Sequence, residues 1–352
     1  MPLTPLSFAP LPRRPLVSVL IANYNYERYV GRALESLQSQ TWPHWEAIVC
    51  DDGSLDRSAE VITSYAVRDP RIRLLRQANQ GMAAALNAAA AVARGDLVAL
   101  LDSDDEYLPA RIERVVARFH ANPEAGCVCH PLCAVRADGD ILKPRHPRLL
   151  ARGWLAPGIL RGVEPALPPC SGLTFRREVA ARVFPLPPHF RRCADKVAQD
   201  RAALLAPVDS LEAVLAFYRI HGANLTGLSG PVTGDSLQAN LDFLHQLWAD
   251  RMEFIRICHG VEADPRPWRE IESAHFFLAA RLLGLHPAEP IDASRIPSPV
   301  RRAVWRALLA LPRPLGAAGL RFWWTENAVK RNVRLLWDFL AGPPVWRQGS
   351  QG

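Results

Sequence analysis

The stretch Asp102-Ser103-Asp104-Asp105 places three carboxylates within four residues. These side chains repel one another unless a positive charge lies among them, and a divalent cation is the simplest source of that charge. Residues 97–101 are apolar and have the length of a buried strand, so the acids are expected at its carboxyl end, where open α/β sheets bind ligands. Alternatively, Asp104 or Asp105 caps a helix over residues 109–120, where negative charge meets the helix dipole. Both interpretations remain open on this stretch alone.

Two earlier apolar segments also end in polar residues. Residues 16–22 lead to Asn23-Tyr24-Asn25, and residues 46–50 lead to Asp51-Asp52-Gly53-Ser54. A further strand is expected over residues 71–75, and helical spacing marks residues 29–37 and 57–67 and the alanine-rich segment after Gly81. Alternating strands and helices predict an α/β fold, Rossmann-like, with a mainly parallel sheet flanked by helices on both faces.

The pattern changes after the acid cluster. Residues 126–135 are expected to form one strand that turns at residues 137–140 into an antiparallel partner. Six prolines in residues 143–170 predict a long loop with one short helix, of the kind that often forms an acceptor side or a lid. The remaining expected elements of this region are a strand at 171–175, helices at 177–183 and 196–205, and a strand at 213–218.

Three regions follow from these patterns. Residues 1–15 form a proline-rich lead, residues 16–230 form the α/β domain, and residues 231–352 form a helical C-terminal region. Helices are expected there at 236–258, 268–285, 298–311 and 320–340.

Composition narrows the class of protein. The 352 residues are 49% hydrophobic and 22% charged, which is typical of a globular chain. Seven cysteines without framework spacing favour a reducing compartment, and we find no signal-peptide core and no apolar run long enough to span a membrane. The expected location is therefore the cytoplasm.

The net charge of +7 lies in the C-terminal tail. Residues 299–352 hold nine Arg or Lys and two acidic residues, together with five of the ten tryptophans. A nucleic-acid binder would carry its basic surface over the fold itself, so we expect no nucleic-acid partner. Arginine beside tryptophan suits a peripheral contact with an anionic membrane surface, and a tail packed on the rest of the chain is the rival interpretation.

Three motifs together resemble the family 2 glycosyltransferases of the GT-A fold. They are residues 19–25 (VLIANYN), residues 50–54 (CDDGS) and residues 101–105 (LDSDD), in the family's order and spacing along residues 16 to about 225. The resemblance implies an inverting transferase that uses a nucleotide-diphosphate sugar donor with Mg²⁺ or Mn²⁺. It also implies an acceptor that is a glycan or a lipid-linked glycan, as in polysaccharide biosynthesis for the cell envelope.

The resemblance also implies roles for the donor-binding residues. Asp52 would accept hydrogen bonds from the base, and Asp51, Ala22 and Tyr24 would shape that pocket. Asp102 and Asp104 would hold the ribose side and the metal, with Asp105 as a second metal or sugar contact.

A general base is implied further along the chain. Family members place an aspartate of an acidic pair before a helix, and Asp195 in Cys193-Ala194-Asp195-Lys196 matches that place. Ala194 stands where many relatives have an acid, so the pair is incomplete, and Asp200 is the competing base. A helix N-cap is the structural alternative for Asp195.

Residues 218–224 (YRIHGAN) match the pattern at the end of the family's catalytic unit. The resemblance implies that Arg219 faces the diphosphate and that His221 joins the metal shell. Arginine forks suit phosphate oxygens and imidazole suits Mn²⁺, while an ordinary structural hydrogen bond is the alternative for the histidine.

A zinc site could be suggested by Cys127, Cys129, His130 and Cys133. A structural zinc site usually needs two pairs of closely spaced ligands, which this spacing does not provide, so buried thiols are expected instead.

Two other functions remain as alternatives. One is a nucleotidyltransferase of sugar-nucleotide synthesis, which normally needs a glycine-rich loop that residues 22–26 lack. The other is a non-catalytic sugar-nucleotide-binding module of the same fold, an alternative that the incomplete pair at Ala194 leaves open.

Overall fold

The computed structural model describes residues 3–221, 234–268, 278–279 and 299–324. The chain divides into two units, one of residues 2–156 and 166–226 and the other of residues 157–165 and 227–352. The first unit holds all the strands described below, and the second is helical.

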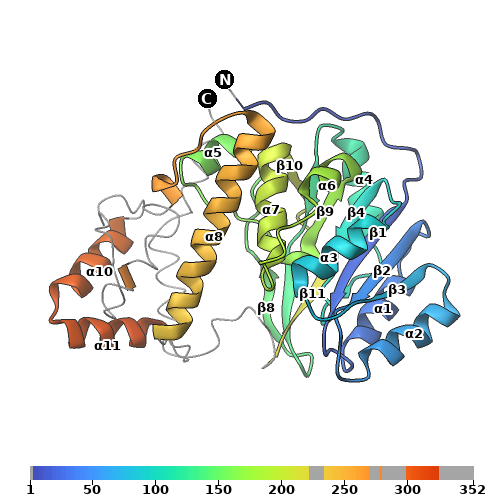
Figure 1. The fold of residues 1–352 in the computed structure, drawn as a ribbon, viewed down its shortest axis with the longest axis horizontal. Helices are drawn as coiled ribbons and strands as arrows, with labels where there is room; N and C mark the ends of the chain where they lie inside the picture. Colours follow the sequence, from blue (N-terminus) through green and yellow to red (C-terminus); the bar gives the residue numbers. More distant parts are fainter. Residues whose placement is uncertain (1–2, 222–233, 269–277, 280–298, 325–352) are drawn as a thin grey trace. The chain divides into compact units, whose positions relative to one another are not determined.

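A mixed sheet forms the centre of the first unit. Among the described residues, seven strands follow the order β10-β6-β9-β4-β1-β2-β3. The part from β9 through β4, β1 and β2 to β3 can be followed in Figure 1. All neighbours are parallel except β9, which runs antiparallel to β4 and β6. The expected mainly parallel sheet is therefore confirmed. Its strands are β1 (Val17–Asn23), β2 (Trp45–Asp51), β3 (Ile72–Arg76), β4 (Leu97–Leu100), β6 (Cys127–Cys129), β9 (Leu173–Arg176) and β10 (Val208–Ser210).

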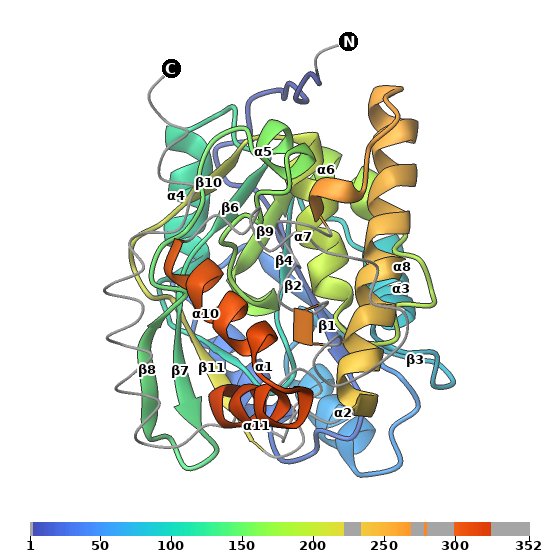
Figure 2. The same ribbon diagram turned by 90° about the vertical axis from the view of Figure 1, so that its left-hand side faces the viewer.

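Helices cover both faces of this sheet. On one face, α1, α2 and α4 join the apolar core formed by Val17, Val19 and Ile21 of β1. On the other face, α3 packs on β1 and β2, and α6 packs on β4 and β9 with α7 against it (Figure 2). Both faces of β1 are therefore buried, which explains its nearly unbroken apolar sequence. The helices are α1 (Val30–Gln38), α2 (Ser58–Arg68), α3 (Met82–Ala91), α4 (Arg111–Ala121), α6 (Arg177–Val183) and α7 (Ala194–Leu205).

A second, smaller sheet has the order β5-β11-β7-β8 within the described residues. Its strands are β5 (Glu106–Tyr107), β7 (Leu132–Arg136), β8 (Ile141–His146) and β11 (Ala216–Ile220). The expected antiparallel turn after residue 136 is confirmed by the pairing of β7 with β8.

The single strand expected over residues 126–135 is wrong. This segment is two strands, β6 in the large sheet and β7 in the small one, separated at His130 and Pro131. Proline has no N–H to donate to a ladder, so the chain leaves the first sheet there and enters the second. The three-residue strand β10 was not expected, because so short a strand shows no period of two.

The helical unit contains α5 (Ala156–Leu160, with its first residue in the other unit), α8 (Gly234–His259), α10 (Pro299–Ala310) and α11 (Arg313–Trp324). Trp268 is fully buried, donates from Nε1 to the carbonyl of Ile159 at 2.7 Å, and lies under the guanidinium of Arg251 at 4.7 Å. These contacts attach residues 157–165 to the helical unit. No helix in the described part of the chain is long and apolar enough to cross a membrane.

Helix α5 confirms the expected short helix, and α8 and α10 lie close to the predicted ranges. The helix expected over residues 320–340 begins earlier, at Arg313. The helix expected over 268–285, apart from Trp268 and residues 278–279, lies outside the described residues, as do the domain boundary near residue 230 and the tail beyond Trp324.

Candidate active site

Three parallel strands bring the polar segments to one edge of the large sheet. Asn23 at the end of β1 pairs with Asp51 at the end of β2, and Leu20 pairs with Leu100 at the end of β4. The segments that follow these strands therefore lie side by side at the carboxyl edge, where α/β sheets bind ligands.

Asp51 joins the ends of β1 and β2. It is fully buried, accepts a hydrogen bond from Asn23 Nδ2 at 2.9 Å, and binds the hydroxyl and the backbone N–H of Ser54. Ser54 in turn accepts a hydrogen bond from the backbone N–H of Asn25 at 2.9 Å. Asp51 thus shapes the turns on both sides of the expected base pocket.

Asp52 faces the segment after β3. Its carboxylate accepts hydrogen bonds from Gln77 Nε2 at 2.7 Å and from the backbone N–H groups of Gln80 at 2.9 Å and Gly81 at 2.7 Å. Gly81 has φ +94°, and a Cβ there would lie 2.6 Å from Cα of Arg191, so glycine is required. An ionised carboxylate offers about four lone-pair positions, so three donors leave Asp52 room for one more.

The acid cluster is connected to β1 through Ser103, which donates to the carbonyl of Ala22 at 2.7 Å. Tyr24 follows on the same loop with its side chain partly exposed to solvent. Ala22 therefore contacts the acid cluster, and the next residue, Asn23, contacts Asp51.

The acidic residues of the cluster have different surroundings. Asp104 lies 2.9 Å from Nε2 of His221. Asp105 is fully buried and accepts hydrogen bonds from the Ser171 hydroxyl at 2.6 Å and from the backbone N–H of Arg219 at 2.9 Å. Burial, followed by the charge of Asp104, raises the pKa of Asp102 and of Asp105 well above the usual value.

Aromatic rings hold His221 in place. The ring of Tyr29 stacks on the imidazole at 4.6 Å between centroids and 11° between planes, and Tyr26 meets it edge-on at 5.8 Å. Burial and the acid cluster together raise the pKa of Tyr26, so this hydroxyl keeps its proton. The two tyrosines therefore direct His221 toward Asp104.

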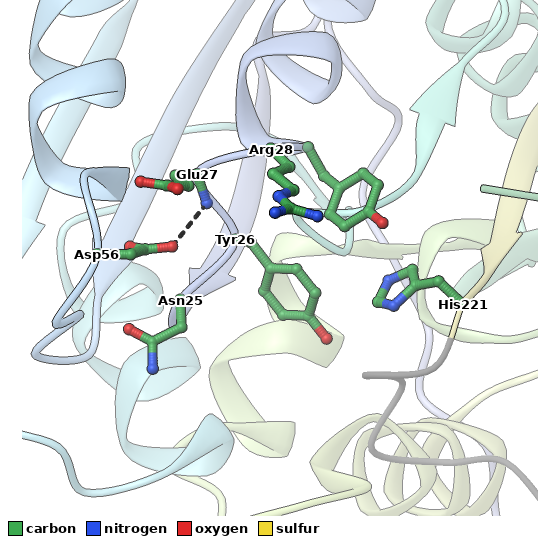
Figure 3. Close-up of a pocket in the computed structure, with 7 residues that line it drawn as sticks. Asn25, Tyr26, Glu27, Arg28, Asp56 and His221 are labelled. Atoms are coloured by element: carbon green, nitrogen blue, oxygen red, sulfur yellow. Dashed lines mark hydrogen bonds between the residues drawn. The ribbon is translucent and has the colours of Figure 1, made fainter. Parts of the chain in front are cut away.

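A pocket of about 370 Å³ opens beside this histidine (Figure 3). In Figure 3 Tyr26 lies between Asn25 and His221, and the backbone N–H of Glu27 donates to Asp56. The lining comes from the loop after β1, the loop before α2 and the end of β11, as Asn25, Tyr26, Glu27, Arg28, Tyr29, Asp56 and His221. Sequence analysis missed Tyr26 and Tyr29, although two aromatic residues just before α1 were a usable signal.

Arg219 differs from the expectation of a diphosphate contact. Its side chain is 4% exposed, forms an ion pair with Glu106, and donates to the carbonyls of Asp104, Arg136 and Ala137. The guanidinium is therefore used to hold the β5 and β7 segments around the acid cluster. The backbone N–H of Arg219 donates a hydrogen bond to the acidic side chain of Asp105 in the site.

The donors present fit a divalent ion that is bound together with substrate phosphates. Asp104 and His221 offer one carboxylate and one imidazole, while Asp105 is turned toward Ser171. Mg²⁺ and Mn²⁺ commonly use one or two protein ligands and complete the shell with phosphates and water. Consistently, no group of three His, Cys, Asp or Glu side chains in the described ranges is arranged to hold a metal by itself.

Asp195 lies in the first turn of α7, next to the acid cluster. Its charge is close enough to contribute to the raised pKa of Asp102, and its carboxylate interacts with the backbone N–H of Cys170. Burial raises the pKa of Asp195 itself. Asp200 is 2% exposed and forms an ion pair with Lys196 at 3.4 Å. Of the two candidate bases, Asp195 is the one that the structure places near Asp102.

The thiols of Cys127, Cys129 and Cys133 are buried and free, and burial raises their pKa. His130 accepts a hydrogen bond at Nε2 from Arg111 Nε at 3.2 Å, and burial lowers its pKa to about 3. These residues pack the core, as expected for buried thiols.

Comparisons with known proteins identify relatives of this chain. The family described as "Glycosyl transferase family 2" matches residues 18–184. Over 257 residues the chain is 37% identical to the "uncharacterized glycosyltransferase alr2836" of Nostoc sp. (strain PCC 7120), covering 70% of this chain and 78% of that protein. It is also 35% identical over 140 residues to the chondroitin synthase of Pasteurella multocida, of which the match covers 14%.

Among solved structures, the crystal structure of S. aureus TarS matches with a TM-score of 0.50 and 17% sequence identity. The match covers 83% of this chain and 53% of that one. At this identity the similarity concerns the fold alone.

Proposed function

The chain belongs to the family 2 glycosyltransferases and has their GT-A fold, and from this premise we propose that it is an inverting, metal-dependent glycosyltransferase with Asp195 as general base. The donor is a nucleotide-diphosphate sugar, and the acceptor is a glycan or a lipid-linked glycan. The observation that supports this function best is the position of Asp195, which lies beside Asp102 at the carboxyl edge of the sheet.

In the proposed reaction, an acceptor hydroxyl attacks the anomeric carbon while the bond from that carbon to the diphosphate breaks. The acceptor proton passes to Asp195, the glycosidic bond forms, and the nucleoside diphosphate leaves with the electron pair. A single displacement inverts the anomeric configuration and needs one base. Because burial raises the pKa of Asp195, its carboxylate is a stronger base than an exposed aspartate.

The donor is proposed to lie along the carboxyl ends of β1, β2 and β4. Asp52 has an acceptor position left for an N–H of the base, and Asp51, Ala22 and Tyr24 form the surrounding turns. Asp102 would hold the ribose side. The hydrogen bond from the backbone N–H of Arg219 to Asp105 stabilises these donor-binding residues.

Asp104 and His221 are the residues proposed to hold Mg²⁺ or Mn²⁺. When bound, the ion would neutralise charge on the diphosphate as it leaves. Tyr29 keeps the imidazole stacked in the orientation that faces Asp104.

The proposed acceptor class also bears on where the enzyme works. A lipid-linked acceptor requires approach to a membrane, and residues 299–352 carry a net charge of +7. Each Lys or Arg near an anionic surface contributes about 1 kcal/mol, so the tail could hold the protein reversibly at the surface. We therefore propose peripheral contact with an anionic membrane, from the cytoplasmic side.

A ligand screen tests this function. The protein is melted with UDP-, GDP- and dTDP-sugars, each with and without Mn²⁺, and one donor class should stabilise it only with the metal. A ligand at a hundred times its Kd stabilises by about 2.7 kcal/mol, which is easily measured. The product formed from that donor should have the inverted anomeric configuration by NMR. Retained configuration, or no stabilisation by any donor, would contradict the proposal.

A further inference from the structure

A buried one-turn 3₁₀ helix, Cys170–Gly172, contacts the acid cluster and the base from a single point of the chain. All three of its residues are buried, and none was singled out by the sequence. In the sequence it lies between the proline-rich loop and β9. Its partners in the fold, which include Asp102 and Asp105, are distant in the sequence.

Ser171 connects two acidic residues of the cluster. Its hydroxyl accepts a hydrogen bond from the backbone N–H of Asp102 at 3.0 Å and donates to the carboxylate of Asp105 at 2.6 Å. The residue is completely buried, so water cannot replace either bond. A residue without a hydroxyl would leave the Asp102 N–H and one Asp105 oxygen without these partners.

Cys170 connects the cluster to α7. Its thiol interacts with the side chain of Asp102, and its backbone N–H interacts with the carboxylate of Asp195. Gln199, one turn further along α7, donates from Nε2 to the carbonyl of Pro168 at 2.8 Å. Helix α7 is therefore attached to this segment at two points on one of its faces.

The turn itself is held rigidly. The backbone N–H of Gly172 donates to Pro169 at 2.8 Å, and its carbonyl accepts from His130 at 3.1 Å. A Cβ at Gly172 would lie 2.6 Å from Cβ of Pro168 and 2.7 Å from the carbonyl oxygen of His130. The tight packing leaves the turn little freedom to move independently of the residues that it contacts.

We propose that the Cys170–Gly172 turn is a positioning element, with Ser171 as its central residue, that sets the spacing between the donor-binding acids Asp102 and Asp105 and the base Asp195. This inference rests on the proposed function. Hydrogen-bonding partners one step removed from metal or substrate typically change affinity or activity by about 10- to 100-fold when they are removed. Small displacements of reacting groups have effects of the same size.

The test compares Ser171→Ala with Thr174→Val. Thr174 lies on β9, is fully buried, and its hydroxyl has no hydrogen-bond partner among the described residues, so its replacement removes a buried hydroxyl without removing a hydrogen bond. The ligand is UDP, GDP or dTDP with Mn²⁺, whichever binds the wild-type protein, and its affinity is measured by calorimetry. We expect Ser171→Ala to weaken this binding by about 10- to 100-fold and to lower kcat with the screened donor by a similar factor. Thr174→Val should leave both unchanged.

A purely structural role predicts a different result, in which Ser171→Ala lowers the melting temperature but matches Thr174→Val in affinity and kcat well below that temperature. That result would overturn the inference. If Ser171→Ala does not fold, the transfer activities of Cys170→Ala and Cys170→Ser are compared instead, because only the serine keeps a donor for Asp102. We expect the serine variant to keep most of the activity and the alanine variant to lose it, and equal activities would overturn the inference. A wild-type protein without nucleotide binding or transfer would instead count against the proposed function.

Discussion

Nε2 of His221 lies 2.9 Å from Oδ2 of Asp104, although the two residues are 117 positions apart in the sequence. The contact exists because β11 ends beside the acid cluster and because Tyr29 stacks on the imidazole at 4.6 Å. It is the geometric basis of the proposed metal site.

Replacing Asp104 with asparagine should abolish metal-dependent transfer and leave the fold intact. One of the few metal ligands is lost, while repulsion inside the cluster decreases, so the melting temperature should not fall. Transfer rates across a Mn²⁺ titration, with circular dichroism as a check of folding, measure both effects. Asp140→Asn, at an exposed loop position, is the matched control. Near-normal turnover of Asp104→Asn, or wild-type activity that is indifferent to EDTA, would rule out this metal assignment.

The ion pair of Asp69 with Arg71 should make stability depend on pH. Hydrogen bonds from Arg71 lower the pKa of Asp69 to about 2, below its unfolded value. The stabilisation is therefore present above about pH 4 and is lost as pH falls through about 2. Because Arg71 is partly exposed, solvent screening limits the effect to about 1 kcal/mol.

Asp69→Asn should accordingly lower the free energy of unfolding at pH 7, and the difference from wild type should shrink as the pH approaches 2. Urea unfolding at several pH values measures it. Glu124→Gln replaces an exposed carboxylate and serves as control. A difference that stays constant with pH would show that the ion pair does not stabilise the fold.

The basic tail should bind anionic vesicles. Full-length protein is expected to sediment with phosphatidylglycerol vesicles at low salt, to be released as salt rises, and to ignore phosphatidylcholine vesicles, because the attraction is electrostatic. Deletion of residues 299–352 should remove the binding. A full-length protein that stays in the supernatant at low salt, or a truncated protein that unfolds, would favour a tail that packs on the rest of the chain.

The sheet and its polar edge could be predicted because local signals specify them. Residues 16–22 and 46–50 are apolar runs followed by acids or amides, and β1 and β2 lie within one residue of those ranges. The direction of each carboxylate could not be predicted, because it depends on distant partners. Asp105 turns inward because Ser171 and Arg219 donate to it, and nothing near Asp105 in the sequence indicates either partner.

Similarly, Arg219 was expected at the diphosphate because arginine suits phosphate, but Glu106 and three backbone carbonyls bind its guanidinium. The break at Pro131 had a local signal in the proline itself. Its consequence, a chain that passes from one sheet to the other, depends on the tertiary arrangement of β6 and β7.

The most direct test of the account is the transfer rate of Asp195→Asn with the donor found in the screen, measured beside Asp200→Asn. Removal of a general base should reduce kcat by about 10²- to 10⁴-fold. Binding of the donor should change little, since Asp195 lies on the acceptor side of the proposed reaction. Asp200→Asn should affect stability more than kcat, because Asp200 is buried against Lys196. A fully active Asp195→Asn, or a loss of kcat seen only in Asp200→Asn, would contradict the assignment of the base.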